Sequence, residues 1–269
     1  TWWAVGETPD QSRRACWTVD GLAPVDASDA VEFDQAMSAK LYGVGLGPGD
    51  PELMTLRAHR LISNAKVVAY PTLAGAASFA RSIAADVIPR GAFEIVMDVP
   101  MSVERAPAQA AYDKGAAEIA SALEAGDDVI CLCEGDPFFY GSFMYLFARL
   151  SDKYDVEVVP GVTSITTCAA RAGMPLAARN ERLTVLPGPL PEAELRARIE
   201  GAESVAIMKV GRHLAKIKGV IDSLNLTERA IYVERASLPE EVVLPLEHAP
   251  AKAPYFSMIL LTKGADPWL

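Results

Sequence analysis

The 269-residue sequence predicts an α/β protein with two domains, the first built on a mostly parallel sheet and the second on a mixed sheet. From residue 37 to about residue 172, short apolar runs alternate with amphipathic stretches, the pattern of strands joined by right-handed helical crossovers. The run at 128–133 is apolar almost throughout, as expected of a parallel strand buried on both faces. No helix is evident between the runs at 241–245 and 255–262, so the sheet of the second half should be mixed, with antiparallel pairs.

The first half carries five expected strands and five expected helices. The strands are expected at 40–44, 66–70, 93–99, 128–133 and 155–159, and the helices at 51–64, 76–85, 106–125, 138–150 and 164–172. Asp50 suits an N-cap and Pro51 the first helical position of 51–64. Gly126 and Gly173 suit the ends of two later helices.

The second half predicts strands at 180–186, 204–209, 230–234, 241–245 and 255–262, with helices at 192–199 and 214–223. We expect an N-terminal domain over 37–152 and a C-terminal domain over 153–269. Residues 1–36 form an N-terminal extension of unknown role, in which tryptophans lie among Pro, Asp, Ser and Gly without a period. The alternative is a packed arm that covers a dimer face.

Composition limits the function classes. A formal net charge of −10 argues against non-specific nucleic-acid binding. No apolar run is long enough for a bilayer, and residues 1–36 lack the basic start and apolar block of a secretory signal. The cysteines, Cys16, Cys131, Cys133 and Cys168, form no C-x-x-C pair and suggest small core residues in a reducing, cytoplasmic compartment. The three histidines have no zinc spacing, so no metal site is expected.

The stretch 41–50 places glycines at alternate positions between a strand and a helix, where α/β sheets bind ligands. It does not fit a dinucleotide loop. Counted from Gly43, the third glycine of G-x-G-x-x-G falls on Pro48, and counted from Gly45 it falls on Asp50. The next strand also ends without the acidic residue that binds a ribose. We expect the loop to approach something flat or uncharged; the alternative is a tight turn with no ligand.

Further loops follow strand ends at 134–140, 160–164, 209–213 and 234–237, and together with 45–50 they would line one site if both sheets face one cleft. In the loop at 134–140, Gly135 permits close backbone approach, Asp136 can cap a helix and Pro137 fixes the turn. The aromatic residues at 138–140 could stack on a nucleoside. The alternative is an ordinary capped helix start beside a buried aromatic cluster.

Four ordered motifs, at 43–50, 134–142, 159–164 and 208–212, resemble the tetrapyrrole methylase family, the S-adenosylmethionine-dependent enzymes of corrin and sirohaem synthesis. The resemblance covers about residues 39–265. Within the family, Tyr42 and the stretches 111–114, 135–145 and 232–237 are most similar to members that methylate carbon 20 of precorrin-2 in cobalamin (vitamin B12) synthesis.

The resemblance implies two α/β domains with an active site in the cleft between them, a homodimer, and S-adenosyl-L-methionine bound in a folded conformation. It places the cofactor contacts on Pro48, Gly135, Asp136, Pro137, Tyr140, Thr163, Ser164, Met208 and Ala236. The residues themselves agree in part, since backbone groups of 135–137 can hold a carboxylate or ribose and Met208 can pack on an adenine. Thr163 and Ser164 are equally explained as a helix N-cap.

The implied reaction is a direct methyl transfer, which needs alignment and exclusion of water more than a metal. A base could remove the proton left on the methylated carbon. The candidates are Asp50, Glu134, Glu234 and Tyr42. Each carboxylate is also explained as a cap or structural partner, and the tyrosine as a strand-end aromatic.

The implied substrate carries many carboxylates, so local cations must offset the acidic protein. The candidates are Arg57, Arg105, Arg179, Arg182, Lys209, Arg212, His213 and Arg235. Lys209 and Arg212 flank a motif loop, while solvated surface charge is the alternative for each residue. Two other functions stay open: another methylase of the same fold, such as a uroporphyrinogen-III methyltransferase or a diphthine synthase, and a non-catalytic tetrapyrrole- or cofactor-binding protein. Metal-free precorrin-2 and its cobalt form are both candidate substrates.

Overall fold

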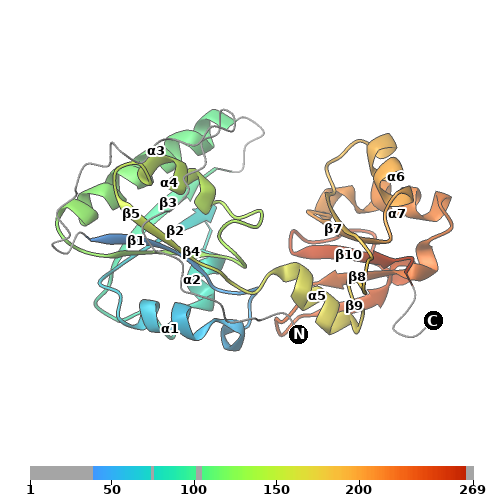
Figure 1. The fold of residues 1–269 in the computed structure, drawn as a ribbon, viewed down its shortest axis with the longest axis horizontal. Helices are drawn as coiled ribbons and strands as arrows, with labels where there is room; N and C mark the ends of the chain where they lie inside the picture. The colour runs from blue at the N-terminus through green and yellow to red at the C-terminus, as the bar shows by residue number, and fades with distance from the viewer. Residues whose placement is uncertain (1–38, 74–75, 101–104, 265–269) are drawn as a thin grey trace, which may run out of the picture. The chain divides into compact units, whose positions relative to one another are not determined.

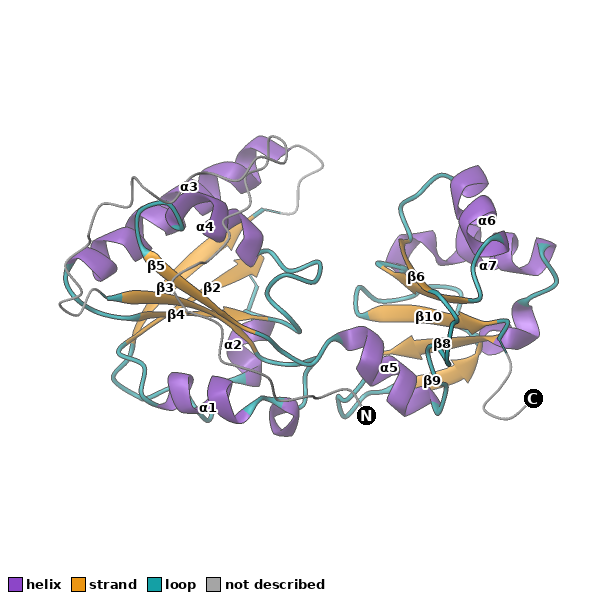
Figure 2. Ribbon diagram, viewed as in Figure 1, coloured by secondary structure: helices purple, strands orange, loops and turns teal. Residues whose placement is uncertain are grey.

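The computed structural model describes residues 39–73, 76–100 and 105–264, and the expected extension at 1–36, with Cys16, lies outside them. Contacts group Ser38–Leu269 as one compact unit, which holds two five-stranded sheets (Figure 1, Figure 2). None of the helices in these described stretches combines the length and apolar character of a membrane span.

The first sheet is wholly parallel, with strand order β3-β2-β4-β1-β5. Its strands are β1 (Lys40–Gly45), β2 (Val67–Leu73), β3 (Phe93–Val99), β4 (Val129–Cys133) and β5 (Asp155–Val159). Every residue of the central strand β4 is buried, including Cys131 and Cys133, as the continuous apolar run predicts.

Helices cover both faces of this sheet (Figure 2). One face packs against α3 (Arg105–Glu124) and α4 (Phe143–Leu150), and the other against α1 (Leu56–Ser63) and α2 (Phe79–Ile83). Val67 and Ala69 of β2 join the core under α3, while Val68 and Tyr70 join the core under α1, because successive strand residues point to opposite faces.

The second sheet is mixed, in the order β6-β7-β10-β8-β9. Its strands are β6 (Leu183–Pro187), β7 (Ser204–Met208), β8 (Ala230–Glu234), β9 (Val242–Pro245) and β10 (Ser257–Thr262). Only β6 and β7 pair parallel; β10 runs antiparallel to both neighbours, and β9 antiparallel to β8. One face packs against α6 (Glu192–Glu200) and α7 (Leu214–Ser223), and the other against α5 (Ser164–Ala172). Short 3-10 turns lie at η3 (Gly211–His213), η4 (Thr227–Arg229) and η5 (Leu246–His248).

The prediction of one continuous helix at 51–64 is wrong. The segment forms a 3-10 turn, η2 (Pro51–Leu53), followed by the separate helix α1. Asp50 does cap the first turn by accepting from the Glu52 N–H. Thr55 then acts as a second N-cap, accepting from the Ala58 N–H at 3.1 Å. Two competing caps in six residues interrupt the helix, and Leu56 is left 90% exposed rather than on the apolar face.

The expected helix at 138–150 begins five residues late, at Phe143. The Asp136 carboxylate accepts from the N–H groups of Phe138 and Phe139 at 2.9 and 3.1 Å, forming a turn instead of a helix cap. Tyr140 follows with φ +56°, in the left-handed region that a helix excludes. Likewise, the expected helix at 76–85 shortens to α2 because Ser78 is its N-cap.

The domain boundary expected between residues 152 and 153 falls before a strand of the first sheet. β5 pairs in parallel with β1 over Lys40–Val44, so residues 155–159 belong with the N-terminal elements. A break within 160–163, between β5 and α5, fits the sheet membership. The sequence gives no local sign that strand 155–159 joins the first sheet, because its partner strand β1 lies more than a hundred positions earlier in the chain.

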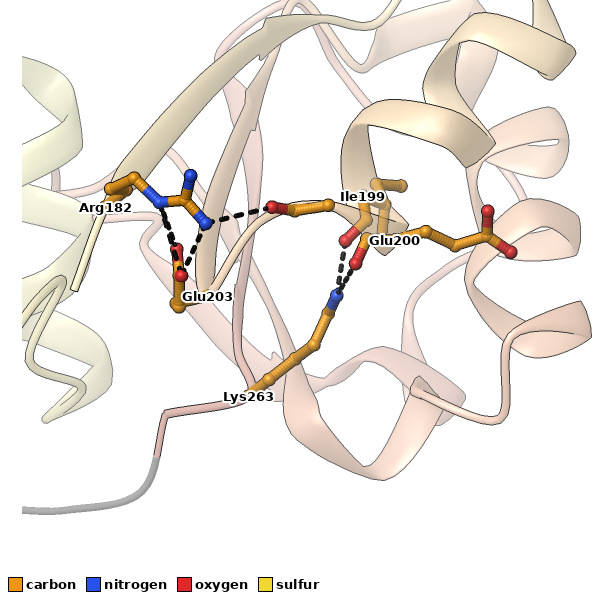
Figure 3. Close-up of polar contacts among 6 residues, drawn as sticks. Arg182, Ile199, Glu200, Glu203 and Lys263 are labelled. Atoms are coloured by element: carbon orange, nitrogen blue, oxygen red, sulfur yellow. Dashed lines mark hydrogen bonds and ion pairs between the residues drawn. The ribbon is translucent and has the colours of Figure 1, made fainter.

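One rim of the second sheet is tied to α6 by charged side chains (Figure 3). Lys263 donates to the carbonyls of Ile199 and Glu200 at 2.5 and 2.8 Å, so its ammonium lies at the negative end of α6. Arg182 binds the Glu203 carboxylate through Nε and Nη2 at 3.0 and 2.6 Å. These contacts stabilise the rim where β10 ends.

Candidate active site

Glycines bring three strand-end loops of the first sheet into backbone contact. A Cβ on Gly45 would lie 2.6 Å from the Gly161 Cα, and a Cβ on Gly161 would lie 2.0 Å from the Gly135 carbonyl oxygen. Gly47 and Gly135 exchange two backbone hydrogen bonds, at 3.3 and 2.8 Å. Side chains at these positions would push the loops apart, so the glycine pattern serves loop packing rather than phosphate binding.

Asp136 ties two of these loops together. One carboxylate oxygen accepts from the backbone of Phe138 and Phe139, and the other accepts from the Gly161 N–H at 3.1 Å. The carboxylate therefore has a structural role, and a ligand would contact the adjacent backbone groups instead. The turn is further closed by Gly141, whose Cβ would lie 2.4 Å from the Pro137 carbonyl oxygen.

Three contacts join residues around the first sheet to loops of the second. The Asp50 N–H donates to the Ser237 hydroxyl at 3.1 Å. The rings of Phe79 and Phe256 have centroids 4.6 Å apart. The Lys209 ammonium lies 5.3 Å from the centre of the Tyr140 ring, a cation–π contact.

Between these contacts lies a pocket that is partly open to solvent. All the expected cofactor residues except Pro137 line it: Pro48, Gly135, Asp136, Tyr140, Thr163, Ser164, Met208 and Ala236. Pro137 is buried beneath its loop. Thr163 also caps α5, as the alternative held, since its hydroxyl accepts from the Thr166 N–H.

Three of the four candidate bases lie outside the pocket lining. Asp50 caps η2 by accepting from the Glu52 N–H at 2.9 Å. Glu234 accepts from the Tyr232 hydroxyl at 2.7 Å and is a structural partner. Tyr42 packs beneath α1 and α2, and burial raises its pKa, which opposes a role as a base.

Glu134 is the candidate base that lines the pocket. It follows the buried strand β4 and is exposed to the pocket's solvent. Crowding by protein atoms desolvates its carboxylate and raises its pKa, an effect that a hydrogen bond from the Ala80 N–H partly opposes. The charge of Glu134 also helps to raise the pKa of Tyr255, which places the two side chains near each other.

Of the candidate cations, Lys209 and Arg235 line the pocket. Arg212 lies outside this lining, with its Nε 3.4 Å from Nε2 of His213. The others also lie elsewhere: Arg57 pairs with Glu157, Arg182 pairs with Glu203, and Arg179 and His213 are outside the lining. The side chain of Arg105 lies outside the described part of the chain.

Sequence reasoning missed much of the apolar wall. The unanticipated lining residues are Phe79, Cys168, Val233, Leu238, Tyr255, Phe256, Ser257 and Met258. Cys168 is buried as expected, but it lies one turn after Ser164 on α5 and so also faces the pocket. Tyr255 and Phe256 precede β10, whose first residue Ser257 pairs with Glu234 at the end of β8. An antiparallel strand thus starts where its neighbours end, a signal that could have placed these rings at the site.

Comparisons with known proteins agree with this architecture. The sequence profile of the Tetrapyrrole (Corrin/Porphyrin) Methylases matches residues 40–250. The chain is 38% identical over 236 residues to a precorrin-2 C(20)-methyltransferase from Sinorhizobium sp, covering 84% of this chain and 96% of the relative. It is 34% identical over 231 residues to the cobalt-precorrin-2 C(20)-methyltransferase of Salmonella typhimurium, covering 84% and 98%.

A solved structure is similar over the same region. It is the uroporphyrin-III C-methyltransferase from Thermus thermophilus complexed with S-adenyl homocysteine, with a TM-score of 0.61 and 26% identity over 84% of this chain and 98% of that chain. The profile match spans most of the sequence, and the two enzyme relatives match nearly end to end. The chain therefore belongs to the tetrapyrrole (corrin/porphyrin) methylase family.

Proposed function

We propose that the chain transfers a methyl group from S-adenosyl-L-methionine to carbon 20 of precorrin-2, or of its cobalt form, in cobalamin biosynthesis, giving precorrin-3A from the metal-free substrate. The observation that carries the proposal is one pocket whose lining combines the family's expected cofactor positions with aromatic rings and two cations. Two relatives with this specificity cover most of the chain.

The pocket lining suits the methyl donor. The first N–H groups of α5, at Ser164, offer backbone donors for a carboxylate. Met208 and Ala236 offer a thioether and a methyl for an adenine ring. When bound, S-adenosylmethionine supplies a methyl group on a positively charged sulfur, which makes the methyl carbon electrophilic.

The remaining lining suits a flat polyacid. Phe79, Phe256 and Tyr255 form a chain of ring contacts, with centroids 4.6 and 5.1 Å apart, which offers faces and edges to a macrocycle. Lys209 and Arg235 supply positive charge for substrate carboxylates within an acidic protein. In this arrangement the chain's residues align the two reactants and exclude water.

The decisive experiment incubates the protein with S-adenosylmethionine and either metal-free precorrin-2 or its cobalt form. Product mass and nuclear magnetic resonance then report how many methyl groups are added and where. One methyl at carbon 20 supports the proposal. Methylation of uroporphyrinogen-III at carbons 2 and 7, or tight cofactor binding without turnover on any tetrapyrrole, would replace it with one of the two alternatives.

A second experiment tests the role of the cations. The double substitution Lys209→Met and Arg235→Gln should raise the Michaelis constant for the tetrapyrrole by tenfold or more and leave the melting temperature within a few degrees. Arg212→Gln is the matched control, because it removes a neighbouring cation outside the pocket. Equal Michaelis constants in the double variant and the control would reject this substrate site.

A homodimer and a cytoplasmic location complete the proposal. Light scattering on the purified chain measures the first, since a dimer has twice the 28.8 kDa mass of one chain. Fractionation of expressing cells measures the second.

A further inference from the structure

Glu134 is the first residue after β4, the strand whose residues are all buried. Its backbone is therefore held by the packed sheet, while its side chain is exposed to the pocket. The backbone of Ala80, at the start of α2, lies near its carboxylate. That helix is fixed by Arg81, which binds Glu94 of β3 at 2.7 and 2.8 Å. A carboxylate carried by a fixed strand end and facing a pocket is positioned for chemistry.

The pocket is lined by two carboxylates, Glu134 and Asp136, and they differ in what they can accept. Both oxygens of Asp136 accept backbone N–H groups, from Phe138, Phe139 and Gly161. These three bonds leave the Asp136 carboxylate little capacity to accept from a ligand in the pocket. Glu134 lines the pocket with an exposed side chain and keeps accepting capacity toward it.

Glu134 belongs to the part of the lining that we assign to the substrate. Its charge acts on Tyr255, a ring of the aromatic wall, and Glu134 is not one of the expected cofactor positions. The other charged or titratable groups in the lining are Lys209, Arg235, Tyr140, Asp136 and Cys168. Desolvation by the surrounding protein atoms raises the pKa of Glu134, which makes its carboxylate a stronger base when ionised.

We propose that Glu134 is the general base that removes the proton from the methylated carbon of the tetrapyrrole; this inference rests on the function proposed above. An electron pair of the macrocycle forms the new carbon–methyl bond, and the pair of the broken sulfur–methyl bond stays on sulfur. The macrocycle then carries one added positive charge. The carbon–hydrogen bond at carbon 20 breaks, its pair returns to the conjugated ring, and the proton passes to a Glu134 oxygen and later to solvent.

The test compares Glu134→Gln with the wild type and with Glu52→Gln, an exposed glutamate at the start of η2 outside the pocket. Calorimetry with S-adenosylhomocysteine should give affinities within about threefold for all three proteins. The turnover number of Glu134→Gln should fall about a hundredfold or more, as for removal of a general base. Substrate deuterated at carbon 20 should react more slowly than protiated substrate in this variant, because proton removal becomes limiting.

Two further readouts separate a base from a structural group. Glu134→Asp should restore part of the rate, and the fall in wild-type rate at acidic pH should disappear in Glu134→Gln. In the ligand-free protein, the raised pKa means that folding disfavours the carboxylate, so Glu134→Gln should be at least as stable as wild type at pH 7. That difference should vanish at low pH, where both side chains are neutral.

An unchanged turnover number in Glu134→Gln would overturn the inference. So would a loss of rate that follows a loss of S-adenosylhomocysteine affinity, or one confined to the Michaelis constant of the tetrapyrrole, since Glu134 would then bind a reactant. Absence of carbon 20 methylation by the wild type would instead reject the proposed function itself.

Discussion

The ion pair between Glu94 of β3 and Arg81 of α2 yields a prediction with a worked magnitude. The carboxylate accepts two hydrogen bonds from the guanidinium, at 2.7 and 2.8 Å, and a third from the Tyr70 hydroxyl. Arg81, and to a lesser degree Tyr70, lower the pKa of Glu94 from 4.5 to about 2. Glu94→Gln removes the charge while keeping the shape of the side chain.

The pKa sets an upper bound on the stability that the ionised carboxylate contributes. A fall from 4.5 to about 2, at about 1.36 kcal/mol per pKa unit, corresponds to about 3.4 kcal/mol. The Arg81 side chain is 41% exposed and that of Glu94 27%, so water screens the pair and about 1–2 kcal/mol is the expected loss. For a chain of this size that loss lowers the melting temperature by about 3–6 °C.

The pH dependence has a definite sign. Because folding lowers the pKa of Glu94, its contribution is complete above about pH 4.5 and is lost as the pH falls toward about 2. Urea unfolding followed by circular dichroism at pH 7, 5, 4 and 3 should show a gap between wild type and Glu94→Gln that narrows below pH 4.5. A gap absent at pH 7, or equally wide at pH 3, would refute this account of the pair.

Three further changes probe other parts of the chain. Gly161→Ala should cost about 2 kcal/mol or more of unfolding free energy, because its Cβ would lie 2.0 Å from the Gly135 carbonyl. The control Gly219→Ala, in α7 with open space around it, should gain about 0.5–1 kcal/mol in the same denaturation assay. Lys263→Met should lower the free energy of unfolding by about 1 kcal/mol, because it removes a cation from the end of α6 (Figure 3). An unchanged free energy of unfolding would show that this contact does not contribute to stability. Arg235→Gly should be about 1 kcal/mol more stable than Arg235→Ala, because φ is +48° there; equal stabilities would show that the backbone carries no strain.

Elements set by local signals could be predicted from the sequence, and features set by distant partners could not. The helix Ser164–Ala172 has its N-cap at Thr163 and a left-handed glycine at Gly173, and both signals lie within a stretch of eleven residues. Asp136 shows the limit of such signals. A capping residue before Pro137 predicts a helix, yet its carboxylate instead binds the Gly161 N–H, on a loop that follows the next strand.

The pocket shows the same division. Most of the expected cofactor positions follow parallel-paired strands, which a strand–loop–helix pattern marks in the sequence. Tyr255 and Phe256 lie before a strand, and they reach the pocket because β10 runs antiparallel to β8. That placement depends on register across the sheet and on no local pattern. Likewise, the glycines at 45, 135 and 161 are needed because their backbones touch one another. The loops that carry them are far apart in the sequence and meet only in the folded sheet.

Backbone strain supports the view that this pocket is where the chain's function lies. In the described residues, six non-glycine residues have positive φ, and three of them, Tyr140, Lys209 and Arg235, line the pocket. Each such conformation costs about 1 kcal/mol or more that glycine would avoid. Tyr140 and Lys209 also contact each other. Stability alone would favour glycine at all three positions, so their side chains are better explained by what they direct into the pocket: one ring and two cations for a flat, negatively charged ligand.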